Sequence, residues 1–161
     1  IVASKKKGGG SHDFISVDEL LKMADEPVLV WKSDTDGFDV PILLDNWSSI
    51  ITRVDVIWIE LHPHLPPTSL LDIKMLSDIF SDSQFEGVLF DNYGCALGRG
   101  AGKSLGELIL YNCQKVSPKT RRLQKLPYYF DLVAFKSSIG SLETRECLID
   151  SLLSGSAGCL K

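Results

Sequence analysis

The sequence predicts an α/β domain with a mainly parallel sheet and helices on its faces. Segments with strand character alternate with segments of helical periodicity along most of the chain. This alternation is typical of parallel strands that are joined by crossover helices. The composition agrees, because 44% apolar and 24% charged residues over 161 positions suit one globular domain with a buried core and exclude global disorder.

The first expected elements are a helix at 17–24 and a strand at 28–31. Ser16 and Glu19 form a capping box at the start of the helix, and Pro27 ends it. The short apolar run that follows is continuous rather than alternating, a pattern of strands that are covered on both faces. We therefore expect this strand inside the sheet.

The next pair of elements is a helix at 41–51 and a strand at 54–61. Apolar residues in the first segment recur at helical spacing, and the second is rich in β-branched residues. Pro63, Pro66 and Pro67 then indicate a loop.

The remaining elements complete the alternation. They are a helix begun by Ser69 and Asp72, a strand at 85–90, a helix begun by a Ser104–Glu107 capping box and running to 114, and a strand at 128–135. The glycine-rich segment 98–104 misses the spacing of a phosphate-binding loop by one residue. We expect a flexible loop there.

The two ends of the chain lack the periodicity of the middle. Residues 1–15 contain a lysine and glycine run that is typical of a loop or linker, and residues 137–161 are expected to form a flexible tail. The folded part is then 16–136. The chain begins with Ile1 rather than methionine, so we expect it to be a fragment of a longer protein.

Charge and hydropathy exclude several classes of protein. No apolar run reaches the ~18 residues of a membrane span, and no basic segment precedes an apolar stretch as in a secretory signal. The net charge is -4, and a basic cluster at 115–125 is interpreted as a solvated loop. We expect a cytoplasmic protein that binds neither membrane nor nucleic acid.

The four cysteines form no C-x-x-C pair, and we expect no metal site.

Polar residues follow three of the expected strands, at 34–39, 60–64 and 91–94. Ligands of parallel α/β sheets bind beyond the carboxyl ends of the strands. These three segments are therefore the candidate functional site.

The candidates for chemistry in these segments are acidic side chains and one histidine. Asp34 and Asp36 suit a general base, a pair that holds a metal, or a hydrogen bond to a cofactor, unless Asp36 and Asp39 simply cap the turn and the next helix. Glu60 closes an apolar strand, so its carboxylate must be solvated, paired or bound. His62 suits a base or a ligand-binding group, or is a loop histidine without a role.

Five short motifs follow one another along the chain. In order they are Val-Asp-Glu-Leu-Leu at 17–21, Lys-Ser-Asp-Thr-Asp-Gly at 32–37, Ile-Glu at 59–60, Asp-Asn-Tyr-Gly at 91–94 and Tyr-Phe-Asp at 129–131. Together they resemble the motifs of one enzyme family, the FkbM-type S-adenosylmethionine-dependent methyltransferases. The resemblance implies that the chain is the C-terminal half of a Rossmann-like methyltransferase sheet, mainly parallel with an antiparallel final strand. The main S-adenosylmethionine-binding elements are then expected upstream of Ile1.

The resemblance also implies roles for individual residues. Asp34 faces the methyl donor and acceptor and is the first candidate for a catalytic base, with His62 as the second. Asp36 stands where the family more often has glutamate, and Glu60 matches the acid at the end of the next strand. Asn92 and Tyr93 are expected to line the acceptor side together with Asp36 and Glu60. The implied activity is O-methyl transfer to a sugar, glycan or small metabolite.

Two other functions fit the same residues. In a metal-dependent glycosyltransferase, Asp34-x-Asp36 would hold Mn²⁺ and a nucleotide-sugar diphosphate. Alternatively, the chain is a non-catalytic α/β domain that binds a partner protein, since the expected cofactor elements have no counterpart in it.

Overall fold

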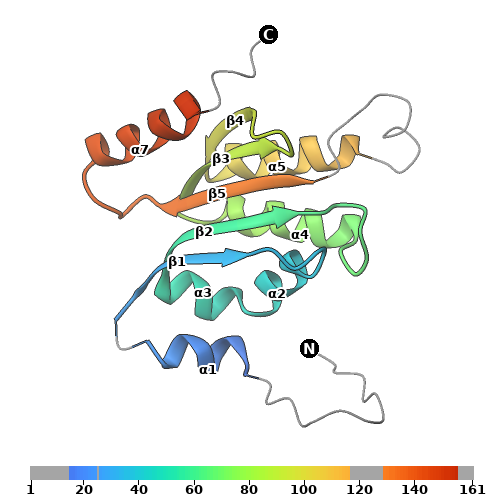
Figure 1. Ribbon diagram of the computed structural model, residues 1–161, viewed down its shortest axis with the longest axis horizontal. Coiled ribbons are helices and arrows are strands. Elements are labelled where there is room, and N and C mark those ends of the chain that lie inside the picture. Colours follow the sequence, from blue (N-terminus) through green and yellow to red (C-terminus); the bar gives the residue numbers. More distant parts are fainter. Residues whose placement is uncertain (1–14, 25, 117–128, 156–161) are drawn as a thin grey trace.

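The computed structural model describes residues 15–24, 26–116 and 129–155. Its centre is a five-stranded open sheet with the strand order β1-β2-β5-β3-β4 (Figure 1). Two of its strands, β1 (Val28–Ser33) and β2 (Val54–Leu61), pair in parallel. The last strand, β5 (Phe130–Lys136), lies between β2 and β3 (Phe85–Asp91) and is antiparallel to both.

The sheet is mixed. Because β5 is antiparallel to β2 and to β3, the strands β1, β2 and β3 point the same way. The fifth strand, β4 (Ala96–Ala101), forms an antiparallel hairpin with β3. The predicted α/β class and the antiparallel final strand are confirmed. The prediction of a mainly parallel sheet is wrong, because β1 with β2 is the one parallel pairing in the described part of the chain.

Helices cover the two faces of the sheet unequally (Figure 1). One face is packed by four helices, which are α2 (Asp39–Asp45), α3 (Trp47–Arg53), α4 (Leu70–Ser81) and α5 (Lys103–Lys115). The short α1 (Val17–Lys22) packs against α3. On the opposite face, α7 (Leu142–Gly155) lies against β3, so the helices of the described residues leave this face open over β1 and β2.

The hydrophobic core forms two clusters, one on each face of the sheet. Alternate residues of β2 (Ile57, Ile59 and Leu61) are fully buried beneath the four-helix layer. A second, smaller cluster lies under α7, where Ile149 packs on Val88, Phe90 and Phe135. Among the described residues, no helix is long and apolar enough to cross a membrane.

The predicted helix at 41–51 is two helices in the structure. The break is at Asn46, whose side-chain amide donates a hydrogen bond to the carbonyl of Ile42 at 2.8 Å. An asparagine that bonds the preceding turn in this way competes with the regular helix. Apolar residues keep their helical spacing on both sides of Asn46, so the sequence pattern gives no sign of the break.

The first strand is less buried than its sequence predicts. Leu29 is 64% and Val30 is 46% exposed, so the prediction that both faces of this strand are covered is wrong. The reason is its place in the fold, since β1 is at one end of the sheet and α7 packs over β3 rather than over β1.

The glycine-rich segment forms β4 instead of the predicted flexible loop. A Cβ at Gly100 would lie 2.6 Å from the backbone nitrogen of Leu105, so the glycine permits the close approach of α5. The predicted Ser104–Glu107 capping box is also absent. The helix begins after Gly102, and the Ser104 hydroxyl accepts a hydrogen bond from the backbone of Ala101 instead.

Residues 142–155 form α7 where the sequence predicts a flexible tail. The helix is held by the buried side chain of Ile149 and by two ion pairs with the sheet, Arg145–Glu86 at 2.7 Å and Glu146–Arg99 at 3.1 Å. All but the last residue of the predicted linker at 1–15, and most of the basic cluster, lie outside the described residues.

Candidate functional site

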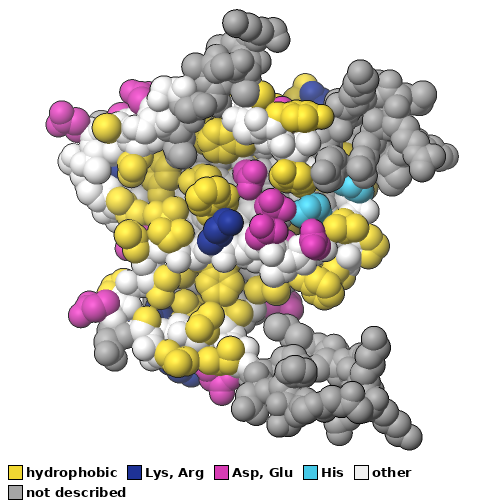
Figure 2. Space-filling view, viewed as in Figure 1, with side chains coloured by type: hydrophobic (Ala, Val, Ile, Leu, Met, Phe, Trp, Pro, Cys, Tyr) yellow, Lys and Arg dark blue, Asp and Glu magenta, His cyan; other side chains and the backbone are white. Residues whose placement is uncertain are grey.

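The three polar segments selected from the sequence share one end of the sheet. The strands β1, β2 and β3 end there, and β5 begins there, with Phe130 paired to both Leu61 and Asp91. Figure 2 shows acidic side chains gathered in this region, next to a histidine and a basic side chain. We call Asp34, Asp36, Asp39, Glu60 and Asp131 the acidic cluster.

Asp39 holds the loop that follows β1. Its side chain is 1% exposed and accepts hydrogen bonds from the Ser33 hydroxyl at 2.6 Å and from the backbone nitrogen of Thr35 at 3.1 Å. All of its described contacts are with this loop. Asp39 is therefore a structural residue, as one interpretation of the sequence held.

Asp34 and Asp36 are exposed on the same loop. Asp36 has a φ of 49° and is followed by Gly37 with a φ of 102°, a left-handed pair that turns the chain back. The carbonyl of Gly37 accepts a buried hydrogen bond from Thr68 at 2.6 Å. This bond ties the loop to the segment that follows β2 and fixes the two aspartates beside it.

Glu60 lies on the face of the sheet that α7 leaves open, opposite Asp131 of β5. Burial raises the pKa of the Glu60 carboxyl to about 7, and the negative charges of Asp34, Asp131, Asp39 and Asp36 add to the shift. Like charges placed directly opposite each other on paired strands are unfavourable. Because the fold nevertheless places Glu60 opposite Asp131, this position is a candidate for function.

Trp58 and Lys32 border the same carboxylates. The Trp58 indole donates a hydrogen bond to Asp131 at 3.2 Å, and the Lys32 ammonium lies 5.3 Å from the centre of the Trp58 ring. The indole therefore orients Asp131, while the lysine supplies positive charge at the border of the acidic cluster.

His62 follows β2 and is 5% exposed. Its Nε2 lies 3.6 Å from a carboxylate oxygen of Glu60, and its ring lies 5.4 Å from the ring of Tyr129. Its Nδ1 is buried without a hydrogen-bond partner in the part of the chain that the structure describes. His62 thus joins the candidate site through Glu60.

The turn after β3 completes the site. The Asp91 carboxylate accepts hydrogen bonds from the backbone nitrogens of Tyr93 at 2.9 Å and Cys95 at 2.8 Å, which fixes the turn. The carbonyl of Asn92 accepts a bond from the Tyr129 hydroxyl at 3.5 Å. Asn92 therefore lies near His62 through Tyr129, whereas Tyr93 is strongly exposed on the turn.

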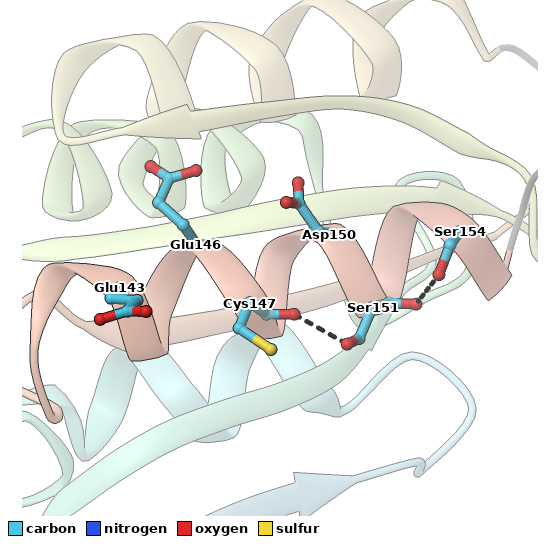
Figure 3. Close-up of a pocket in the computed structure, with 6 residues that line it drawn as sticks. All are labelled: Glu143, Glu146, Cys147, Asp150, Ser151 and Ser154. Atoms are coloured by element: carbon cyan, nitrogen blue, oxygen red, sulfur yellow. Dashed lines mark hydrogen bonds between the residues drawn. The ribbon is translucent and has the colours of Figure 1, made fainter.

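Two surface hollows among the described residues lie away from the acidic cluster. One, of 490 Å³, follows α7 and is lined by Glu143, Glu146, Cys147, Asp150, Ser151 and Ser154 (Figure 3). All six come from a single helix, so this hollow is a shallow groove. The other, of 280 Å³, lies between α7 and β4. Within the described residues, no three acidic, histidine or cysteine side chains converge as a metal site.

Sequence reasoning missed Asp131 and Tyr129 as members of the site. Both lie at the start of the last strand, and sequence order gives no sign that this strand lies next to β2. The Tyr-Phe-Asp motif at 129–131 was a usable signal, but it pointed to a family rather than to a contact with Glu60.

Comparison of the chain with protein-family models, curated proteins and solved structures finds no match.

Proposed function

We propose that this chain is part of an S-adenosylmethionine-dependent O-methyltransferase that acts on a hydroxyl of a sugar, glycan or small metabolite. The observation that carries the proposal is the acidic cluster at the end of the sheet where β1, β2 and β3 terminate. This is the end at which α/β sheets bind their ligands. The short FkbM-like motifs supply the reaction type.

The charge of the site suits this cofactor. When bound, S-adenosylmethionine supplies an activated methyl group on a positively charged sulfur. Exposed carboxylates of Asp34 and Asp36 favour a cationic ligand by direct Coulomb attraction. The buried Nδ1 of His62, which has no hydrogen-bond partner among the described residues, leaves a further polar atom near the same end of the sheet.

The chain's own residues have separable tasks in this proposal. Asp34 and Asp36 attract and orient the methyl donor, and Asn92 and Tyr93 contact the acceptor. Asp39 keeps the loop after β1 in place through Ser33 and Thr35. Methyl transfer is an in-line displacement, so accurate positioning supplies most of what the protein contributes.

Calorimetric titration of the full-length protein with S-adenosylmethionine tests the proposal. We expect saturable binding that Asp34→Asn weakens about tenfold, because one attractive charge is lost. Asp45→Asn is the matched control, since Asp45 is exposed at the end of α2 and outside the acidic cluster. Saturable binding of Mn²⁺ with a nucleotide-sugar, and none of S-adenosylmethionine, would support a glycosyltransferase instead.

One observation favours a second candidate function, a partner-binding domain without catalytic activity. Val30 and Trp58 are exposed apolar side chains on the same face of β1 and β2, and exposed apolar surface of this kind is typical of protein interaction sites. Absence of binding to both cofactor sets in the titration would favour this candidate.

A further inference from the structure

The carboxylates near the strand ends differ in what they can still bind. Asp39 is buried and its described bonds serve the loop. Asp34 is exposed, and Asp131 accepts the Trp58 indole bond. Glu60 combines partial burial with access, because its side chain is 20% exposed. Glu60 is thus screened from water on most sides and still open to a ligand.

His62 supplies the second, independent observation. Its imidazole is buried against Glu60, and its Nδ1 has no partner among the described residues. Leaving a buried polar atom unpaired costs free energy, so such atoms are often found at functional sites. The 3.6 Å between Nε2 and the carboxylate is longer than a hydrogen bond and within the range of an ion pair.

We propose that Glu60, rather than Asp34, accepts the proton of the acceptor hydroxyl, and that His62 is the positioning residue for the Glu60 carboxylate. The inference rests on the proposed function and deepens it. In this step the O–H bond of the acceptor breaks and its electron pair stays on the acceptor oxygen. The proton forms a new bond to a carboxylate oxygen of Glu60, which becomes neutral.

The surroundings of Glu60 make it a stronger base than an ordinary carboxylate. A pKa of about 7 lies near neutral pH, where general bases work best. The same surroundings select the acceptor, because a cluster of negative charges repels phosphate and carboxylate groups. The acceptor is therefore uncharged or cationic beside its reactive hydroxyl. The charged and titratable groups that face Glu60 are Asp34, Asp36, Asp39, Asp131 and His62, with Lys32 at the border.

The first experiment measures protonation without an acceptor. In the full-length protein labelled with ¹³C-glutamate, Glu60→Gln assigns the Glu60 carboxyl signal, and a pH titration by NMR gives its midpoint. We expect a midpoint near 7 that Asp131→Asn lowers, because the opposing negative charge is removed. Asp45→Asn is the control and leaves the midpoint in place. Titration of Glu60 in the ordinary range of exposed glutamates would overturn the proposal.

The second experiment measures methyl transfer from labelled S-adenosylmethionine to a panel of methyl hexopyranosides, again with the full-length protein. We expect kcat/KM to rise with pH through about 7 and to level off, because the base must be deprotonated. Glu60→Gln should lower it about 10²–10⁴-fold and flatten this profile, while Glu60→Asp restores part of the rate. His62→Gln should change the pH at which kcat/KM reaches half of its plateau.

The two proposals fail in different ways. A Glu60→Gln enzyme that keeps the wild-type rate and pH profile overturns the inference about Glu60 and leaves the proposed function standing. A full-length protein that binds no S-adenosylmethionine in the calorimeter overturns the proposed function, and the inference with it.

Discussion

At the scale of single residues, the groups that surround each acidic side chain of the site determine what it can do. Asp39 is buried, yet the Ser33 hydroxyl and the Thr35 backbone stabilise its charge. Glu60 is partly buried beside other carboxylates, which raises its pKa. Two carboxyl groups a short distance apart thus carry out different tasks, one holding a loop and one available for a ligand.

Replacing Asp39 by asparagine tests the structural role of its carboxylate. The Thr35 N–H donates to both carboxylate oxygens of Asp39, so in Asp39→Asn the amide nitrogen replaces one acceptor and faces this N–H. We expect a loss of about 1–3 kcal/mol in the free energy of unfolding, measured by urea denaturation. Asp36→Asn is the control, because Asp36 is exposed at positive φ, a conformation that asparagine adopts readily. Equal stability of the two variants would contradict this role.

Glu60 makes the stability of the protein depend on pH. Its pKa is about 7 in the folded protein against 4.5 for an ordinary glutamate, so between these values the native state binds more protons than the unfolded state. Stability then falls as pH rises through this window. We expect Glu60→Gln to raise Tm by about 3 °C at pH 8, and by less at pH 5. Differential scanning calorimetry checks this, with Glu107→Gln on the exposed face of α5 as control.

At the scale of elements, close backbone approaches shape the helical layer. Helices α4 and α5 meet at Gly106, whose carbonyl accepts a hydrogen bond from the Ser77 hydroxyl at 2.8 Å. A side chain at Gly106 would overlap Ser81 Oγ and the backbone carbonyl of Ser77. The two helices can lie this close only because the position has no Cβ.

Substitution of Gly106 by alanine should therefore separate the two helices. Although alanine has the higher helix propensity, we expect Gly106→Ala to cost about 1–3 kcal/mol through overpacking. Chemical denaturation monitored by circular dichroism gives the value. Glu107→Ala, one residue further along α5 and exposed, should change stability by less than about 0.5 kcal/mol. A Gly106→Ala variant as stable as this control would show that the helices adjust freely.

Local signals in the sequence predicted most helices and strands, but not which of them lie next to each other in the fold. Capping boxes form at Ser16 and Ser69, where the motif is completed within four residues, whereas Ser104 lies inside α5 and bonds Ala101 instead. The glycines of β4 suggested a loop, because the reason for them is the close packing of α5 on the strand, which glycine content alone does not indicate. The contact between Glu60 and Asp131 joins strands far apart in the chain, and no local pattern encodes it.

At the scale of the whole molecule, the uneven coverage of the sheet decides what its surface can do. The face packed by α2–α5 is closed, whereas the opposite face is covered by α7 over β3 and open over β1 and β2. The acidic cluster lies at one end of this open area, and the exposed side chains of Val30 and Trp58 lie along it. A ligand at Glu60 and a partner on β1 would therefore occupy adjoining surfaces.

The open end strand should make the isolated 161-residue chain self-associate. In the described part of the chain, β1 pairs with β2 alone, and Leu29 adds a strongly exposed apolar side chain. Exposed apolar end strands are templates for pairing with another chain, and a lysine on such a strand blocks it. In sedimentation velocity runs over a concentration series, we expect Leu29→Lys to shift the chain toward monomer without lowering Tm. Leu71→Lys is the matched control, because Leu71 is equally apolar and exposed but lies on α4. If both lysines acted alike, general solubility rather than the open strand would govern association. If neither changed the sedimentation, the chain would not associate through β1.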